Sequence, residues 1–122
     1  MRFVNPIPFV SDIALSKSYY CELLGLKILS DFGNFILVET GYAIHDGKSL
    51  EQTVWKKTIE TSSPYGRGNM LLDREHEDVD AAFERIAPHV ELIHSVERQD
   101  WGQRVFRFYD PDGHAVEIGE PQ

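Results

Sequence analysis

Two stretches of the chain follow the same order of predicted elements, and this repeat constrains the fold more than any other feature of the sequence. In the first half, a strand at 2–10 precedes an amphipathic helix at about 12–24 and three short strand-like runs. In the second half, a strand at 69–73 precedes a helix at about 78–87 and three further strands. The six remaining strands are predicted at 26–30, 34–39, 42–45, 90–96, 103–109 and 114–118.

The repeat predicts an α+β fold built from two βαβββ modules. A chain of 122 residues has the length of one domain, because domains hold about 100–200 residues. We therefore expect one domain over 1–122, with a first module at about 1–48, a connector at 49–68 and a second module at about 69–122. The connector is expected to hold a short helical piece around 50–59.

The first predicted strand and helix carry clear local signals. Pro6 and Pro8 interrupt the strand, and each removes one hydrogen-bond donor, so a free edge or a bulge is expected there. Leu15, Tyr19 and Leu23 recur at the helical spacing i, i+4, i+8 and give the following helix one apolar face. In the second half, a helix with the same kind of apolar face ends before a proline.

Composition and charge exclude several classes of protein. The chain has 12 Lys and Arg against 20 Asp and Glu, a net charge of -8, which argues against nucleic acid or a membrane as a partner. No apolar run approaches the length of about 20 residues that spans a bilayer. Cys21 is the one cysteine, so there is no intrachain disulfide. These observations predict a cytoplasmic protein.

Both ends of the repeat carry motifs of a known superfamily. The motifs are Val-Ser-Asp-Ile at 10–13, Ser-Tyr-Tyr at 18–20 and Leu-Gly-Leu at 24–26, with Trp-Gly-Gln-Arg at 101–104 and the run from Tyr109 through Asp-Pro-Asp-Gly-His to Ile118. Together with the repeat, they resemble the vicinal oxygen chelate superfamily, which includes glyoxalase I, extradiol dioxygenases, fosfomycin resistance proteins and bleomycin-binding proteins. The resemblance implies a mixed sheet curled into a cup around a site, the glyoxalase/bleomycin resistance/dioxygenase-like fold.

The motif near the C-terminus also makes sense as a turn between two strands. Asp110 and Pro111 suit the first two positions of a type I turn, and Gly113 follows where a positive φ is tolerated. We therefore interpret Asp110 and Asp112 as turn-forming residues rather than catalytic ones.

The resemblance implies metal ligands at four positions, which this chain fills unusually. Glu117 matches the superfamily's C-terminal carboxylate ligand, and His45 is the nearest candidate on the last strand of the first module. Asn5 stands where a histidine is usual, and Asn69 (Leu71 in a shifted register) is its counterpart in the second module. Neutral amides are weak ligands for zinc, nickel or iron, so we expect no tightly bound metal, with a divalent metal at Glu117 as the alternative. The other histidines are interpreted as structural or surface residues: His76, His89, His94 and His114.

Aromatic and polar residues predict a different use of the cup. Alternation along the strand at 103–109 places Gln103, Arg107 and Tyr109 on the face opposite Phe106 and Phe108. There Arg107 could orient an anionic or polar ligand, or it could form a cross-strand ion pair. The residues predicted to bind a ligand are His45, Trp55, Trp101, Gln103, Arg107 and Tyr109.

Three functions remain open at this point. The first is binding of a small organic molecule in the sheet cup, without a tightly bound metal or other cofactor. The second is a metal-dependent lyase, isomerase, dioxygenase or thiol transferase with Glu117 as catalytic metal ligand; an enzyme would be a glyoxalase-type lyase or dioxygenase. The third is an interaction module that uses a sheet edge or the Trp55 and Trp101 loops. A homodimer is expected, because exposed sheet edges are normally paired or covered.

Overall fold

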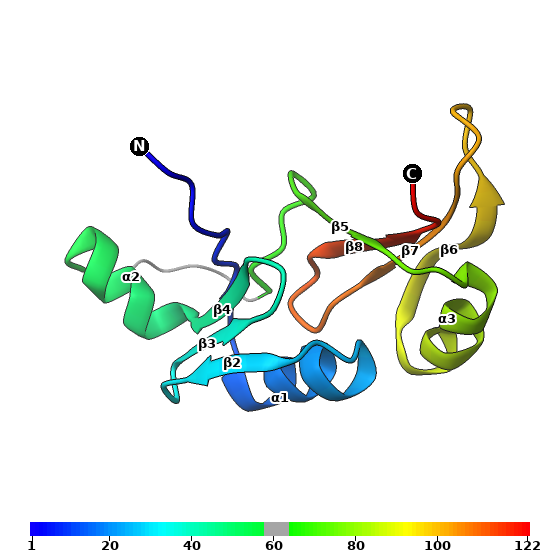
Figure 1. Cartoon of the computed structure of the whole chain (residues 1–122). Helices are drawn as coiled ribbons and strands as arrows, with labels where there is room; N and C mark the ends of the chain where they lie inside the picture. Colours follow the sequence, from blue (N-terminus) through cyan, green and yellow to red (C-terminus); the bar gives the residue numbers. More distant parts are fainter. Residues whose placement is uncertain (58–63) are drawn as a thin grey trace. The chain divides into compact units, whose positions relative to one another are not determined.

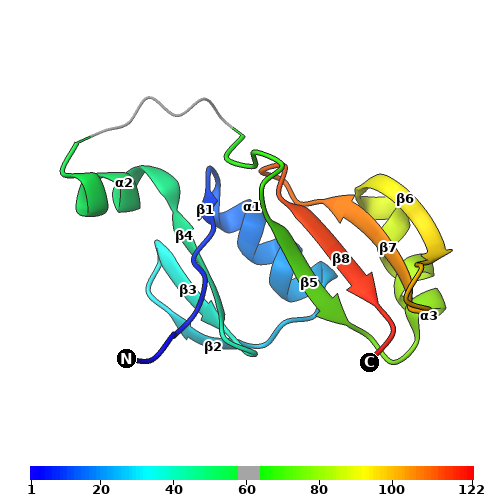
Figure 2. The ribbon, with the colours of Figure 1, turned by 90° about the horizontal axis from the view of Figure 1, so that it is seen from above.

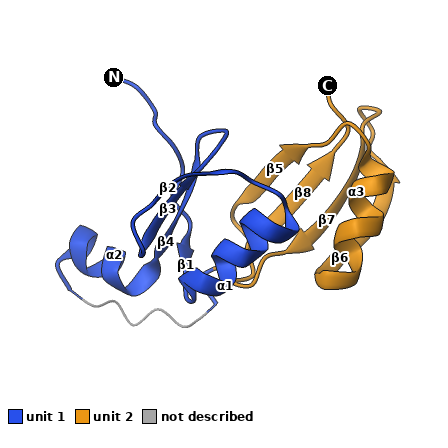
Figure 3. Ribbon diagram, turned by 60° about the horizontal axis from the view of Figure 1, so that its bottom comes forward, with its two compact units in different colours: residues 1–65 blue, residues 66–122 orange. Residues whose placement is uncertain are grey.

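The computed structural model describes residues 1–57 and 64–122. The chain divides into two compact units, residues 1–65 and residues 66–122, which are coloured separately in Figure 3. Each unit holds one four-stranded mixed sheet. The two predicted βαβββ modules are therefore confirmed.

The first unit builds its sheet in the order β1-β4-β3-β2. β1 runs parallel to β4, and the other two pairs are antiparallel. The elements of this unit are β1 (Phe9–Val10), α1 (Ile13–Lys17), the π-helix η1 (Ser18–Leu23), β2 (Ile28–Asp31), β3 (Phe35–Val38), β4 (Tyr42–Asp46) and α2 (Gly47–Trp55). Figure 1 labels α1, α2 and the strands β2 to β4, and Figure 2 labels β1.

The second unit repeats this topology with the strand order β5-β8-β7-β6, seen side by side in Figure 2. β5 is parallel to β8, and β7 forms antiparallel pairs with β8 and β6. The predicted hairpin between the last two strands is thus confirmed. The elements are β5 (Leu71–Glu75), α3 (Val79–Ile86), the 3-10 helix η2 (Ala87–His89), β6 (Glu91–Arg98), β7 (Arg104–Tyr109) and β8 (Ala115–Gly119).

The first strand is shorter than the sequence predicts. The prediction was a strand over 2–10, whereas β1 holds only Phe9 and Val10. Pro6 and Pro8 explain the difference, because neither can donate a hydrogen bond to β4. Pro8 still contributes its carbonyl oxygen, which accepts from the amide of His45 at 3.3 Å.

The first helix begins where the sequence places it and then widens. The side chain of Asp12 caps it by accepting from the amide of Leu15 at 3.0 Å. Its second half is a π-helix, and the amide of Leu24 closes it by donating to the carbonyl of Tyr19, five residues earlier, at 3.0 Å. This wider turn places Tyr20, which is fully buried, against the ring of Tyr42 on β4 at 5.2 Å.

The core of the second unit lies between α3 and one face of its sheet. Phe106 and Phe108 on β7 are fully buried. Phe106 meets Phe83 of α3 edge to face, with ring centroids 5.2 Å apart. The helix is capped by Asp78, whose carboxylate accepts from the amide of Ala81 at 2.9 Å. Phe106 and Phe108 therefore occupy the helix-packed face, and Arg107 points to the opposite one, as alternation along the strand predicted.

The helical piece expected around 50–59 is α2, which spans Gly47–Trp55 and is capped by Asp46. Lys56 ends it in the left-handed conformation, with φ 59°. The part of the predicted connector from 58 to 63 lies outside the described residues. Among the helices of the described part of the chain, none has the length and apolar character that crossing a membrane requires.

Candidate functional site

Four polar side chains, one from each strand, lie in register across the sheet of the second unit. Asp73 on β5 pairs with Glu117 on β8, Glu117 with Arg107 on β7, and Arg107 with His94 on β6. Cross-strand partners point to the same face of a sheet, and here it is the face opposite α3. We call these four residues the charged row.

Arg107 is the centre of the charged row. Its Nε donates to a carboxylate oxygen of Glu117 at 2.6 Å, and its Nη1 lies 3.0 Å from Nε2 of His94. Its Nη2 donates to the side-chain oxygen of Gln99 at 3.3 Å. The side chain of Glu117 is only 6% exposed and that of Arg107 23%. Of the two roles that the sequence left open for Arg107, the cross-strand ion pair is present in the structure.

The ion pair changes the expectation for stability. From the sequence, Arg107 and Trp101 are expected to affect ligand binding more than folding. Because Arg107 neutralises the nearly buried carboxylate of Glu117, its removal is also expected to destabilise the fold. A binding experiment on Arg107 therefore needs a variant that keeps the positive charge.

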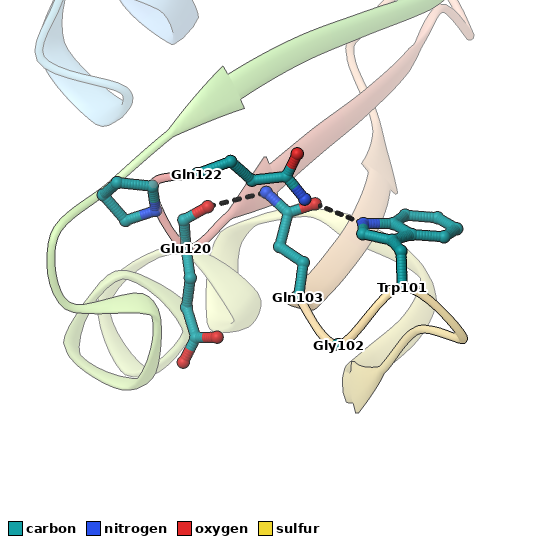
Figure 4. A pocket seen from close by; sticks show the side chains of 6 residues that line it. Trp101, Gly102, Gln103, Glu120 and Gln122 are labelled. Atoms are coloured by element: carbon teal, nitrogen blue, oxygen red, sulfur yellow. Dashed lines mark hydrogen bonds between the residues drawn. The ribbon is translucent and has the colours of Figure 1, made fainter.

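A shallow cavity of about 660 Å³ lies at the end of the β6–β7 hairpin, beside the C-terminal residues. Figure 4 shows the two hydrogen bonds that hold the side chains of its wall in place. The indole Nε1 of Trp101 donates to the side-chain oxygen of Gln103 at 2.9 Å, and the Gln103 amide nitrogen donates to the carbonyl of Glu120 at 2.6 Å. Trp101 is 59% exposed. The lining residues are Trp101, Gly102, Gln103, Glu120, Pro121 and Gln122.

Gln99 joins this cavity to the charged row. The backbone N–H of Gln99 donates to the backbone carbonyl of Gln103 at 2.8 Å, and the backbone carbonyl of Gln99 accepts from the N–H of Gly102 at 2.9 Å. Its side chain contacts Arg107, as described above. The predicted residues Trp101, Gln103 and Arg107 are therefore brought together through a residue that the sequence did not single out.

Tyr109 stands on the same face of β7 at the other end of the charged row. It pairs with Ala115 on β8 and is 37% exposed. Leu71 pairs with Ala115 from the other side and is 46% exposed. The charged row is thus bordered by exposed aromatic and apolar surface toward Tyr109, and by the Trp101 cavity toward the β6–β7 turn.

The two other predicted ligand-binding residues belong to the first unit. Nδ1 of His45 lies 2.9 Å from the carbonyl oxygen of Asp46, and its ring packs against Phe35. The indole of Trp55, at the end of α2, packs against the ring of Phe9, with centroids 5.6 Å apart. For Trp55 the structure thus shows the kind of contact expected of a packing residue.

The residues at the four superfamily ligand positions do not fit a transition-metal site. Asn69 lies in an exposed bend before β5, so that Asp73, not Asn69 or Leu71, is in register with Glu117. The amide nitrogen of Asn5 donates to the carbonyl of Pro6 at 3.3 Å. Glu117 is already paired with a guanidinium, which opposes a second cation. Within residues 1–57 and 64–122, no three His, Cys, Asp or Glu side chains are grouped to hold a metal ion.

Cys21 is not an activated nucleophile. It lies in the π-helix and is partly buried. Burial raises the pKa of its thiol, an effect that Lys17 only partly opposes. Nucleophilic cysteines need the pKa lowered, so the surroundings of Cys21 do not activate its thiol.

Comparison with known proteins identifies relatives of the whole chain. Residues 3–122 match the family model described as a glyoxalase-like domain. A crystal structure of a protein of unknown function from Agrobacterium tumefaciens str. C58 is 69% identical, with 100% of this chain and 95% of that chain covered and a TM-score of 0.96. No curated protein matches the chain.

More distant structures share the fold. A glyoxalase-related enzyme from Fulvimarina pelagi is 21% identical, with a TM-score of 0.82. The match covers 99% of this chain and 88% of that chain. A lactoylglutathione lyase from Agrobacterium tumefaciens is 20% identical over 98% of this chain and 92% of that one, with a TM-score of 0.70. The predicted glyoxalase/bleomycin resistance type of α+β fold is confirmed.

Proposed function

Because the chain belongs to the glyoxalase-like domain family, we propose that it binds a small organic molecule. The binding surface is the face of the second unit's sheet that lies opposite α3. The polar end of the ligand meets the charged row, and its apolar part lies toward Trp101. Small-molecule sites commonly combine apolar or aromatic walls with a few polar groups that fix orientation. The exposed indole of Trp101 and the network around Arg107 provide both kinds of surface.

The observation that carries the proposal is the Glu117–Arg107 pair. The Glu117 carboxylate accepts hydrogen bonds, and the Arg107 guanidinium beside it donates them. Both side chains are mostly removed from water. A ligand group with a donor beside an acceptor, such as a carboxamide, complements this arrangement at both positions. The acidic side chains on the same face, including Asp73, make a neutral polar group a better match than an anion.

Benzamide is the simplest probe with such a group on a flat ring. We expect it to shift the NMR resonances of the Trp101 indole N–H, the Gln103 side-chain amide and the Arg107 Nε–H in one saturable titration. Arg107→Lys keeps the charge but not the planar fork of donors. That variant is expected to weaken the affinity by about tenfold or more, because hydrogen bonds to charged groups contribute about 1.5–3 kcal/mol and each 1.4 kcal/mol is about a factor of ten.

The matched control is Arg85→Ala, which removes an arginine from the last turn of α3, on the other side of the sheet. It should leave benzamide binding unchanged. Benzoate, titrated in parallel, should bind more weakly than benzamide if the acidic surroundings of Arg107 act as argued. Shifts spread over the whole spectrum, or none at these three groups, would contradict the proposed site.

We further propose that the protein holds no stoichiometric transition metal. Two amides, one ring-packed histidine and one carboxylate paired with arginine supply little of the charge and softness that such metals use. Elemental analysis after purification without chelator or histidine tag is expected to find well below one zinc, nickel, iron or manganese per chain. About one metal per chain, lost in Glu117→Gln, would instead favour the metal-dependent enzyme.

A homodimer is part of the proposed assembly. β6 is an eight-residue edge strand of its sheet, and Leu92 and Ile93 on it are 37% and 42% exposed. Edges of this kind are normally covered or paired, and closed two-fold symmetry is the commonest arrangement. Sedimentation equilibrium at micromolar concentration is expected to give about twice the chain mass of 14.0 kDa. A clean monomer would refute the dimer and leave the binding proposal standing.

A further inference from the structure

His94 lies at the β6 end of the charged row, and both of its ring nitrogens contact groups of fixed hydrogen-bonding character. Nδ1 is 2.7 Å from the carbonyl oxygen of Ser95; a carbonyl only accepts, so Nδ1 carries a proton. Nε2 is 3.0 Å from Nη1 of Arg107; a guanidinium only donates, so Nε2 accepts. The contacts therefore require a neutral imidazole with its proton on Nδ1.

A second proton, placed on Nε2, reverses this contact. The new N–H faces the N–H of Arg107, so that donor meets donor and positive charge meets positive charge. An alternative partner is at hand, because a carboxylate oxygen of Glu97 lies 3.7 Å from Nε2. Protonation thus favours a small rotation of the ring from Arg107 toward Glu97.

The charged groups around His94 offer its Nε2 atom two alternative partners, one for each protonation state. Arg107 faces it from β7 and Glu97 from β6 itself. Glu117 on β8 and Asp73 on β5 continue the row beyond Arg107. Gln99 links the two alternatives, because its side chain accepts from Arg107 and donates to Glu97 at 3.1 Å. α3 packs on the other face of the sheet.

We propose that His94 is a pH-responsive positioning residue: neutral, it holds Arg107 against Glu117, and protonated, it turns to Glu97 and releases Arg107. Imidazole is the side chain whose charge ordinarily changes between pH 5 and 8. The effect of His94 on ligand binding rests on the proposed function. The exchange of its contacts between Arg107 and Glu97 does not, because it takes place in the protein without ligand. The site is then organised for binding at pH 8 and loosened as the pH falls toward 5.

The first test uses the free protein. Long-range ¹H–¹⁵N spectra of histidine rings distinguish the tautomers, and the Nε–H resonance of Arg107 reports its contact with Glu117. At pH 8 we expect His94 as the Nδ1–H tautomer. Between pH 8 and 5, its second protonation and a shift of the Arg107 Nε–H resonance toward that of an exposed arginine should follow one curve. An Arg107 signal that stays constant while His94 titrates would overturn the inference.

Variants separate His94 from the other groups that titrate. His94→Gln offers an acceptor oxygen that does not titrate, so its Arg107 signal is expected to stay constant over the same range. Glu97→Gln removes the alternative partner and should move the His94 titration to lower pH, whereas the same-strand control Glu91→Gln should not. An unchanged midpoint in Glu97→Gln would count against the two-way exchange.

Benzamide binding tests whether the protonation of His94 affects ligand affinity. Its affinity is expected to fall about tenfold from pH 8 to pH 5 in the wild type and to hold steady in His94→Gln. Equal loss of affinity in both proteins would overturn the regulatory role of His94. Absence of benzamide binding at every pH would contradict the proposed function, while coupled titration of His94 and Arg107 would still support the inference.

Discussion

Asp110→Ala is expected to lower the free energy of unfolding by about 3 kcal/mol, since each buried donor left without a partner costs about 1–3 kcal/mol. The side chain of Asp110 is fully buried in the turn between β7 and β8. One of its oxygens accepts from the amides of Asp112 and His114 at 2.9 and 2.8 Å, and the other lies 2.9 Å from Nδ1 of His114. Alanine leaves all three groups without this partner.

Urea unfolding measures this effect, and Asp100→Ala is the matched control. Asp100 lies in the exposed turn between β6 and β7, where a surface substitution changes stability by less than about 0.5 kcal/mol. Asp110→Asn keeps one acceptor oxygen and should fall between the two variants. If Asp110→Ala were as stable as Asp100→Ala, the buried turn network would contribute little to the fold.

Gly66→Ala is expected to cost about 2–3 kcal/mol, at the upper end of the usual range for an overpacked site. Gly66 is the first residue of the second unit, and its amide donates to the carbonyl of Asp112 at 2.8 Å. A Cβ atom there would overlap the backbone carbonyl of Gly113. Backbone atoms of a buried turn cannot move aside as a flexible side chain does, so the chain must lose this contact.

The comparison variant for this prediction is Gly33→Ala. Gly33 has a φ of +84°, and an added Cβ meets nothing within 4 Å, so the substitution tests conformational strain without a clash. Strain of that kind costs about 1–2 kcal/mol. Equal midpoints of urea unfolding for the two variants would show that the overlap at Gly66 is relieved by a small shift of the turn.

The sequence predicted the parts of the fold that depend on local signals. The repeat, the two helices and the last hairpin were predicted because capping residues, apolar spacing and the Asp-Pro-Asp-Gly turn act within a few residues. Three details escaped it. The strand predicted at 69–73 is β5, which begins only at Leu71. The first strand is reduced to Phe9 and Val10, since two prolines remove more pairing than a bulge would. The π-turn after Lys17 carries no signal that helical periodicity detects.

The site was predicted less completely, for a physical reason. Alternation correctly grouped Gln103, Arg107 and Tyr109, because it depends on one strand alone. The sequence analysis interpreted His94 as a structural or surface residue and did not single out Asp73, because their place in the charged row depends on which residue of the neighbouring strand lies opposite each of them. The register of β6 against β7 is shifted twice, once on each side of His94. Counting along the sequence therefore could not pair His94 with Arg107.

The π-turn in the first helix has a consequence for how sequences of this family are aligned. A π-helical turn holds about one residue more than an α-helical turn, so the segment Ser18–Leu23 contains more residues than a regular α-helix of the same length would. Relatives that retain a regular α-helix between their equivalents of Asp12 and Gly25 are expected to be one residue shorter there. A single-residue gap at this place would then record a change of helix type, with no displacement of the strands that follow.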